Sequence, residues 1–473
     1  MKNNPKKLKK VKKIRSYAYK FSDTGVSSFG GLGLSEYLAN RLGLWQSLQD
    51  QVPIKRGKYD RMDIIRGAVS GLLSGSRGTA SLSEIAEDNG LLKLLGIEKL
   101  PCEKIFWEEL ERLGEDKVLD PLNNALAHWA CKLLQRCDQQ ECVNAHGFIP
   151  VFGDGSLLEG SDKREGTKKI KGKGTGLMWS NWFVGPLMAT QHLSAQAEGE
   201  QKGLMDKLGL LLEEVLEPLG WRSKSLFLMD SLHGDGPTLD RLEAENLTYV
   251  IGANKLKAAS KVLDEMPDWQ WQAVAQADCR SDCIAEQTCV CWIQCTGWEK
   301  KRLLVGKRFK RKGDLFWETV SVMTNLPAAR LQESSQNDPG FARKVWQLYS
   351  SKMAMENYFK DVLIDLSGHR VPCNKLAHNR GYYALLSLAY NLSRGIDLIG
   401  GQSLREEKRQ KAKANGHKRS PAKWMRIWRL RRKLFSLPAR ITVHARKATL
   451  IILGGGQSNL DLFKAYWQAI ADC

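Results

Sequence analysis

Two short apolar runs that each reach an aspartate constrain the fold of this chain most. The first is FIPVFGDGS at 148–156, which reaches Asp154, and the second is SLFLMDS at 225–231, which reaches Asp230. Apolar runs of this length that are rich in β-forming residues indicate buried strands. A carboxylate at the end of a buried strand needs a partner. The two runs therefore predict a sheet that presents one carboxylate from each of two strands.

The residues around these runs predict an α/β fold. LMWSNWFVGPLMATQHLSA is typical of two antiparallel strands, QKGLMDKLGLLLEEVLEPLG of a helix, and LTYVIGAN of a further strand. Either aspartate has an alternative role as a turn or helix cap, because Asp before Gly or Ser often serves one. The stretch after Asp230 is SLHGDG, so Asp235 is a rival for the second carboxylate.

A third acid, Glu356, lies within WQLYSSKMAMENYFKDVL at residues 346–363, which we expect to form one helix. The helical period stacks five side chains on one side: Tyr349, Lys352, Glu356, Lys360 and Leu363. One acid among cations and an aromatic ring suits a metal carboxylate beside a phosphate. The alternative is a solvated helix face with a Glu–Lys pair worth only about 0.3 kcal/mol.

Periodicity and composition divide the chain into six segments. We expect a basic arm at 1–30, an all-helical N-terminal domain at 31–145, the first part of an α/β core at 146–254, a β-rich insertion at 255–330, the second part of the core with the Glu356 helix at 331–400, and a basic helical C-terminal region at 401–473. The last region carries sixteen Lys or Arg against two Glu between Arg405 and Lys447.

The charge of the chain indicates a polyanionic partner. Lys and Arg number 72 against 52 Asp and Glu, which gives a formal charge of +20 and a pI of about 9.4. Nucleic acid is the partner that such a balance favours. Neither a signal peptide nor an apolar run of the roughly 18 residues needed to cross a bilayer is found, so we expect a cytoplasmic protein.

Five of the eleven cysteines cluster within 279–295. Their spacing, C-x3-C-x5-C-x-C-x3-C, lacks the paired C-x2-C knuckles of a zinc ribbon. Half-buried cysteines on a strand are therefore favoured over structural zinc, which stays open as an alternative. Without a secretory signal, reduced thiols are favoured over disulfides.

The three acids in this context resemble the DDE transposases of bacterial insertion sequences, which have a ribonuclease H-like core. The closest resemblance is to the subgroup whose third acid lies in the signature Tyr, two residues, Arg, three residues, Glu, six residues, Lys. Tyr349 and Glu356 have the spacing of that signature. Its Arg is replaced by Lys352, and its Lys by Leu363, with Lys360 one turn earlier. The resemblance covers roughly residues 30–400.

The resemblance implies metal-dependent DNA cleavage and strand transfer. Asp154 would bridge two Mg²⁺ (or Mn²⁺) ions, Asp230 would hold one and Glu356 the other, because magnesium prefers hard oxygen ligands. Tyr349, Lys352 and Lys360 would bind DNA phosphates. The implied partners are double-stranded DNA at the element ends and the target, and a second copy of the chain in a synaptic homodimer, associated with the bacterial nucleoid.

Two other functions use the same residues differently. A catalytically inactive or domesticated DNA-binding protein would keep the basic surfaces and lose the metal site. A metal-dependent nuclease would use the same carboxylates without strand transfer.

Overall fold

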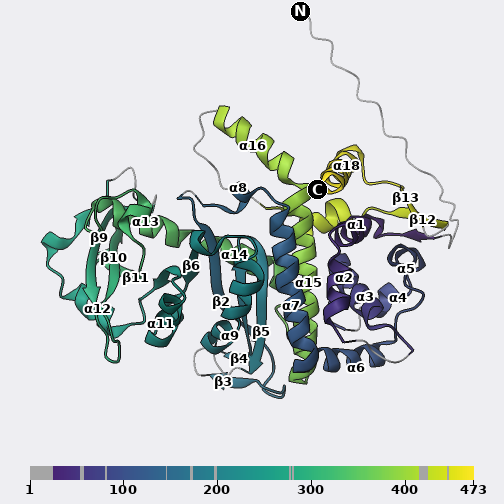
Figure 1. Ribbon diagram of the computed structural model, residues 1–473, viewed down its shortest axis with the longest axis horizontal. Coiled ribbons are helices and arrows are strands. Elements are labelled where there is room, and N and C mark those ends of the chain that lie inside the picture. Colours follow the sequence, from purple (N-terminus) through teal and green to yellow (C-terminus); the bar gives the residue numbers. More distant parts are fainter. Residues whose placement is uncertain are drawn as a thin grey trace, which may run out of the picture.

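The protein has a mixed α/β fold with one large mixed sheet and many helices (Figure 1). The computed structural model describes residues 25–53, 58–79, 82–144, 146–170, 174–195, 200–275, 279, 282–414, 424–444 and 447–473. Most of the basic arm expected at 1–30 therefore lies outside the described residues. None of the helices in the described ranges is both long and apolar enough to cross a membrane.

The region before the sheet is helical. Its helices are α1 (Gly33–Arg41), α2 (Leu44–Gln51), α3 (Arg61–Ser74), α4 (Leu82–Ala86), α5 (Asn89–Leu95), α6 (Glu103–Leu113), α7 (Asp116–Gln135) and α8 (Gln139–Cys142). Helix α7 packs on the sheet through β5 and on the long helix α15 (Leu376–Gly400). The helical region consequently shares one continuous hydrophobic core with the sheet.

The first part of the sheet combines an antiparallel meander with two parallel strands. Its strands are β2 (Ile149–Glu159), β3 (Lys168–Ile170), β4 (Gly174–Val184), β5 (Leu187–Ala195), β6 (Ser225–Met229) and β7 (Thr248–Gly252). Strand β4 lies between β5 and β2 in antiparallel pairing, and β2, β6 and β7 run parallel. The helices that connect and follow these strands are α9 (Glu200–Asp206), α10 (Leu208–Leu211), α11 (Gly236–Ala244) and α12 (Lys257–Asp264).

The first predicted strand is longer than expected. We expected it to end at Asp154, whereas β2 continues to Glu159. The antiparallel partner β4 supplies the reason, because it pairs with β2 as far as Glu159 and Gly176. Only the parallel pairing with β6 ends early, at Gly153 and Met229.

The β-rich segment extends the same sheet. Its strands are β8 (Gln272–Ala273), β9 (Cys283–Ile293), β10 (Arg302–Arg311) and β11 (Glu318–Thr324), and all are antiparallel to their neighbours. Strand β11 also pairs antiparallel with β7, which joins this segment to the core strands. In Figure 1 it forms the end of the molecule that lies far from α7 and α15.

The stretch expected to form one helix is interrupted. Helix α13 (Pro339–Ser350) ends before a turn, α14 (Met353–Lys360) follows it, and a π-helical turn covers Asp361–Asp365. The hydroxyls of Ser350 and Ser351 donate to backbone carbonyls three or four residues earlier, a contact that competes with regular helix geometry. The expected stacking on a single face therefore does not continue from Tyr349 to Leu363.

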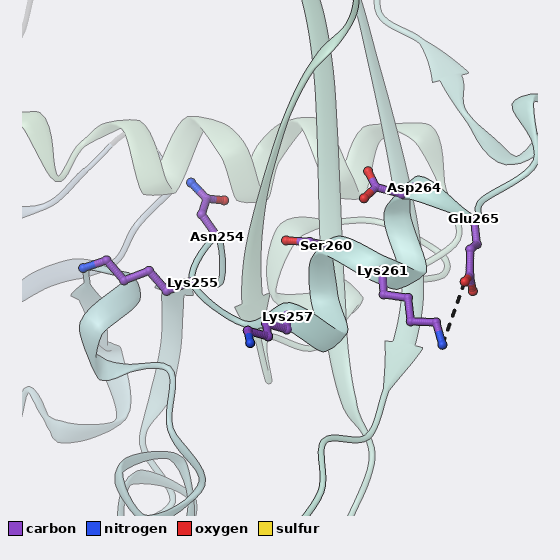
Figure 2. Close-up of a pocket in the computed structure, with 7 residues that line it drawn as sticks. All are labelled: Asn254, Lys255, Lys257, Ser260, Lys261, Asp264 and Glu265. Atoms are coloured by element: carbon purple, nitrogen blue, oxygen red, sulfur yellow. Dashed lines mark ion pairs between the residues drawn. The ribbon is translucent and has the colours of Figure 1, made fainter.

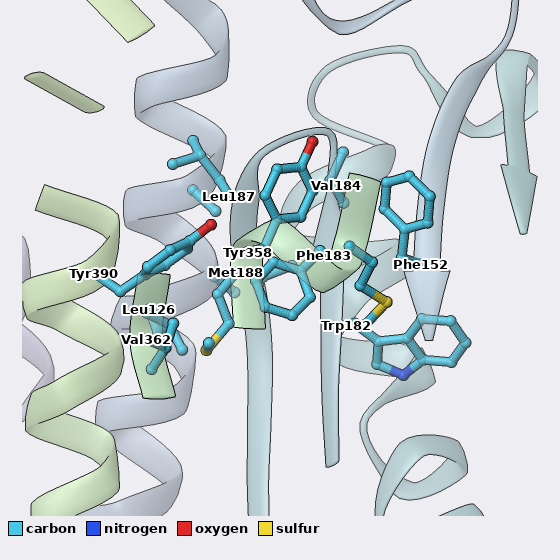
Figure 3. Packing of buried hydrophobic residues seen from close by; sticks show 14 of the residues in the cluster. Leu126, Phe152, Trp182, Phe183, Val184, Leu187, Met188, Tyr358, Val362 and Tyr390 are labelled. Carbon is cyan, nitrogen blue, oxygen red and sulfur yellow. The ribbon is translucent and has the colours of Figure 1, made fainter. Parts of the chain in front are cut away.

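Helix α15 and the π-helical turn pack against the meander. Figure 3 shows Tyr390 of α15, Tyr358 of α14 and Val362 of the turn around Phe183 of β4. The Phe183 ring lies 5.7 Å from the Tyr358 ring and 5.9 Å from the Tyr390 ring. This packing fixes the position of α14 against the sheet.

The C-terminal region is only partly helical, which corrects our expectation for 401–473. Its elements are α16 (Gln402–Ala414), α17 (Ile427–Leu430), β12 (Ala439–His444), β13 (Lys447–Ile452) and α18 (Gln457–Asp472). Strands β12 and β13 form a hairpin that β1 (Val26–Ser27) extends into a small sheet. The hairpin sequences ARITVH and KATLII are rich in β-branched residues, which favour strands.

Several arginines of this basic region bind inside the protein. Arg426 forms ion pairs with Asp361 and Asp365, and both Arg405 and Arg409 pair with Glu141. Part of the segment's positive charge is therefore neutralised by acidic groups of the protein itself.

Candidate active site

The register of two parallel strands brings Asp154 and Asp230 together. Gly153 of β2 pairs with Met229 of β6, and each is followed directly by one of the two aspartates. Neighbouring strands in a sheet lie about 4.8 Å apart. The two carboxylates therefore leave adjacent strands at the same level of the sheet.

Close packing beneath Asp154 requires a glycine. A Cβ atom at Gly153 would lie 2.5 Å from the Trp182 ring and 3.0 Å from the Met229 sulfur. Asp154 itself is half-buried, with 23% of its side chain exposed. Its Oδ1 accepts a hydrogen bond from the Gly155 amide at 3.0 Å.

Lys352 is the cationic partner of Asp154. Its Nζ donates to Asp154 Oδ2 at 2.8 Å, and its side chain is 17% exposed. The two residues are 198 positions apart in the sequence. The lysine at the signature's Arg position thus contacts the first carboxylate directly.

Asp230 begins the short 3₁₀ turn Ser231–His233. Its Oδ1 accepts from the Leu232 amide at 2.8 Å, and His233 Nε2 lies 3.7 Å from the same oxygen. The side chain remains 31% exposed. The carboxylate thus combines the capping role with a position beside Asp154.

The rival, Asp235, is the N-cap of α11. Its Oδ1 accepts from the Thr238 amide at 2.9 Å, and its Oδ2 lies 3.1 Å from the Thr238 hydroxyl. Both of its oxygens therefore serve the start of this helix. Asp230, rather than Asp235, follows the strand that pairs with β2.

Tyr349 lies against both carboxylates. Burial raises its pKa to about 12, and the negative charges of Asp230 and Asp154 contribute to the increase. A Cβ atom at Gly252 would lie 2.7 Å from the Tyr349 hydroxyl and 2.8 Å from the Ser231 amide. The absence of a side chain at Gly252 therefore makes room for the hydroxyl at the ends of β6 and β7.

Glu356 and Lys360 lie on α14 and face solvent. Glu356 is 65% exposed and Lys360 is 49% exposed, and their charged atoms are 3.7 Å apart. Within the described part of the chain, no three His, Cys, Asp or Glu side chains are grouped closely enough to hold a metal ion. The structure thus gathers Asp154, Asp230 and Tyr349 with Lys352, and leaves Glu356 outside this group.

A lysine-rich pocket of about 440 Å³ opens beyond the carboxyl end of β7 (Figure 2). It is lined by Asn254, Lys255, Lys257, Ser260, Lys261, Asp264 and Glu265. Because β7 is parallel to β6, the pocket lies at the same edge of the sheet as Asp230. Sequence analysis missed these lysines, although the sequence NKLK directly after a strand was the signal for them.

The clustered cysteines lie mainly on β9. All eleven cysteines of the protein are free thiols. Burial raises the pKa of Cys289 to about 12 and that of Cys291 to about 11. These two thiols are therefore protonated at neutral pH in the metal-free protein.

Comparisons with known proteins identify the family. The model for "Transposase DDE domain group 1" matches residues 195–472, which is more than half of the chain. No curated protein matches the chain. Among solved structures, a piggyBac transposase synaptic complex with hairpin DNA shows 12% identity and a TM-score of 0.37, covering 94% of this chain and 79% of that one. The chain belongs to the group 1 family of DDE transposases.

Proposed function

We propose that this transposase cleaves double-stranded DNA at the ends of a bacterial insertion sequence and joins the freed 3′ ends to a target. The observation that carries the proposal is the register of β2 and β6, which sets Asp154 and Asp230 side by side beneath Tyr349. Two adjacent carboxylates with a hydroxyl and an ammonium group suit phosphodiester chemistry, in which a cation and a phosphate must meet.

We further propose that the core is ribonuclease H-like. The order β5-β4-β2-β6-β7, with three antiparallel strands followed by two parallel ones, supports this assignment. In this view residues 146–254 and 331–400 form the core, 255–330 is an insertion, and 31–145 and 401–473 are the flanking helical and C-terminal regions. The flanking regions would then support the core and contact DNA.

Members of the DDE family use divalent metal ions, and the residues of this site fit such ions. Asp154 and Asp230 offer hard oxygen ligands, and the ammonium group of Lys352 already lies on Asp154. These two carboxylates would hold Mg²⁺ or Mn²⁺. The Tyr-Arg-Glu-Lys signature adds Glu356 as the third ligand, which would have to turn toward them from the solvent-facing position that it has in this structure. Bound there, the ions would activate the attacking oxygen and neutralise the leaving one.

Tyr349 and Lys352 position the DNA strand in this proposal. With a pKa of about 12, Tyr349 keeps its proton at neutral pH and donates a hydrogen bond to a phosphate oxygen. Lys352 and a divalent ion compete for Asp154, so we expect the ammonium group to transfer to a phosphate when the metal binds. Lys360, exposed on α14, would bind a neighbouring phosphate.

The test uses full-length protein and a linear DNA that carries the gene with its flanking sequences. Asp154→Asn should abolish both Mg²⁺-dependent nicking and joining of a labelled 3′ end to a plasmid, while DNA binding remains within a few fold. Asp461→Asn on α18, an exposed aspartate, is the matched control and should keep all three activities. Nicking by the Asp154→Asn variant would refute the assignment.

Three further results separate the alternatives. Nicking without joining by the wild-type protein would indicate a nuclease, and binding without either reaction would indicate a DNA-binding protein. Glu356→Gln tests the third ligand by itself, because full activity of this variant would remove Glu356 from the site. Crosslinking of two protomers on DNA ends tests the proposed synaptic homodimer.

A further inference from the structure

The small sheet of β1, β12 and β13 has one covered face and one open face. Ala439 and Ile441 of β12 are buried, because the sheet packs on α5 and on the 3₁₀ turn Gly30–Leu32. A Cβ atom at Gly33 would lie 2.6 Å from Leu450 Cδ2, so this side of the hairpin is closely packed. Successive side chains of a strand point to opposite faces, and the alternate residues of β12 and β13 therefore form the open face.

The open face combines one arginine with threonine and aliphatic side chains. Strand β12 presents Arg440 and Thr442, and both are exposed. Ile451 of β13 lies opposite Arg440, and Val26 of β1 flanks Arg440 on the other side. Ile451 is 51% exposed and Val26 is 43% exposed. Thr449 of β13 is exposed opposite Thr442, so a pair of threonines lies beside the row that contains the arginine.

Arg440 differs from the arginines that precede it in the chain. Arg426 and Arg431 bind carboxylates and carbonyls inside the protein. Within the part of the chain that the structure describes, the Arg440 side chain has neither a hydrogen bond nor an ion pair. No acidic residue occurs at positions 408–460. The open face therefore presents a guanidinium group that no carboxylate of its own segment neutralises.

The charge of this face favours a polyanion as its partner. A symmetric contact between two copies would place the face against itself and bring two Arg440 side chains together. The first 20 residues of the chain carry nine basic residues and no acidic one, so like charges disfavour a contact with this arm as well. Double-stranded DNA supplies negative charge, and its major groove accepts a two-stranded β-ribbon.

The side chains of the open face suit base edges better than phosphates. In the major groove, arginine donates two hydrogen bonds to guanine, threonine bonds to several bases, and aliphatic groups contact the thymine methyl. A surface that binds only the backbone uses many cations. Here Val26 and Ile451 flank a single arginine, which is the arrangement for one guanine contact beside apolar contacts.

We propose that the β12–β13 ribbon reads DNA sequence in the major groove. Arg440 binds a guanine, Ile451 contacts the methyl group of an adjacent thymine, and Thr442 and Thr449 contact neighbouring base edges. In Figure 1 the ribbon lies on the other side of α7 and α15 from β2 and β6, so recognition and the carboxylates occupy separate parts of the protein. The inference rests on the proposed function for the identity of the DNA, which would be the element ends.

The experiment uses the full-length protein and duplexes taken from the sequences that flank its gene. DNase I protection locates the bound site, and competition with a shuffled duplex at fixed salt gives the specificity ratio. Each guanine of the site is then replaced by 7-deazaguanine, which lacks the N7 acceptor. At one guanine this replacement should weaken wild-type binding about tenfold. Arg440→Met should lower the specificity ratio by a similar factor and should no longer respond to the replacement.

A second pair of changes tests the apolar contact. Replacing thymine by uracil removes the methyl group, and at one position this should weaken wild-type binding about fourfold. Ile451→Ala should bind the two duplexes equally well. Arg41→Met is the matched control, because Arg41 is exposed at the end of α1 that lies away from Gly33; it should keep the specificity ratio and both responses. Arg440 and Ile451 are exposed, so their replacement should leave the thermal midpoint unchanged.

An unchanged specificity ratio and an unchanged 7-deazaguanine response in Arg440→Met would overturn the proposal. Equal wild-type affinity for the flanking and the shuffled duplexes would overturn it as well. Loss of self-association in sedimentation, with the specificity ratio intact, would assign the open face to a second copy of the chain instead. Selective binding that depends on Arg440 but leads to no nicking or joining would contradict the proposed function and leave this inference standing.

Discussion

Replacing Arg394 tests the buried charge network that joins α15 to the π-helical turn after α14. Arg394 and its partners Asp361 and Asp397 are each only 1–2% exposed. Its guanidinium pairs with Asp361 and lies 3.1 Å from Asp397. Arg394→Met leaves these carboxylates buried with fewer partners. Removing one partner of a buried ion pair costs about 3–5 kcal/mol. We therefore expect the free energy of unfolding of the Arg394→Met variant to fall by this amount at pH 8.

The loss should depend on pH with a definite sign. Desolvation raises the pKa of Asp361 to about 6, although Arg394 and Arg426 lower it in part. A raised carboxyl pKa favours the folded state below the ordinary value near 3.8, and this benefit is lost as pH rises through 6. Removing Arg394 raises the pKa of Asp361 further, so this carboxyl is neutralised more readily in the folded variant. Each additional pKa unit therefore reduces the loss of unfolding free energy by about 1.4 kcal/mol at pH 5, where the folded carboxyl is protonated, but not at pH 8.

Urea unfolding followed by tryptophan fluorescence at pH 5 and pH 8 measures both effects. Arg429→Met is the matched control, because Arg429 is exposed on α17, and surface changes usually stay within about 0.5 kcal/mol. A loss below about 1 kcal/mol for Arg394→Met at pH 8, or an equal loss at both pH values, would refute the reasoning.

Two other substitutions test packing and charge near the sheet. In the Gly153→Ala variant, the new Cβ atom would lie 2.5 Å from the Trp182 ring, next to Asp154. The variant should therefore lose about 1–3 kcal/mol of stability in urea unfolding and should nick DNA more slowly. An unchanged urea midpoint would contradict this prediction. Burial raises the pKa of Glu243, but hydrogen bonds from Arg302 and others outweigh it and lower the pKa to about 2. The ionised Glu243 therefore stabilises the fold fully above about pH 4.5, and this stabilisation is lost as pH falls through 2. Glu243→Gln should consequently lower the free energy of unfolding more at pH 7 than at pH 3. An equal loss at both pH values would contradict the assignment.

The strands that carry the first two acids could be predicted from sequence, because short apolar runs ending in Asp contain both the burial signal and the chemistry. The segment after Asp230 illustrates the limit of that information. Asp230 precedes a serine and Asp235 precedes a glycine, which is a context typical of capping aspartates, and both do cap a helical turn. Only the pairing of β6 with β2 distinguishes them. The paired residues Gly153 and Met229 are 76 positions apart in the sequence, and the register of such distant strands is set by tertiary packing.

The interruption of the Glu356 helix could not be predicted from periodicity. Tyr349, Lys352 and Glu356 have helical spacing, but the hydroxyls of Ser350 and Ser351 bond back to the preceding turn. Helical propensity and spacing average over such local competition. As a result, Tyr349 and Lys352 turn toward the carboxylates while Glu356 faces solvent.

The segment that contains Arg426 and Arg431 helps to hold α14 in position. Arg426 pairs with Asp361 and Asp365 on the π-helical turn that continues directly from α14. Arg431 donates to the Asp365 carbonyl at 2.9 Å and to the Leu73 carbonyl of α3 at 2.8 Å. One short segment thus connects the helix of Glu356 to the N-terminal helices. Because charged hydrogen bonds of this kind are strong and directional, the orientation of α14 depends on a region for which the sequence predicted only basic helices.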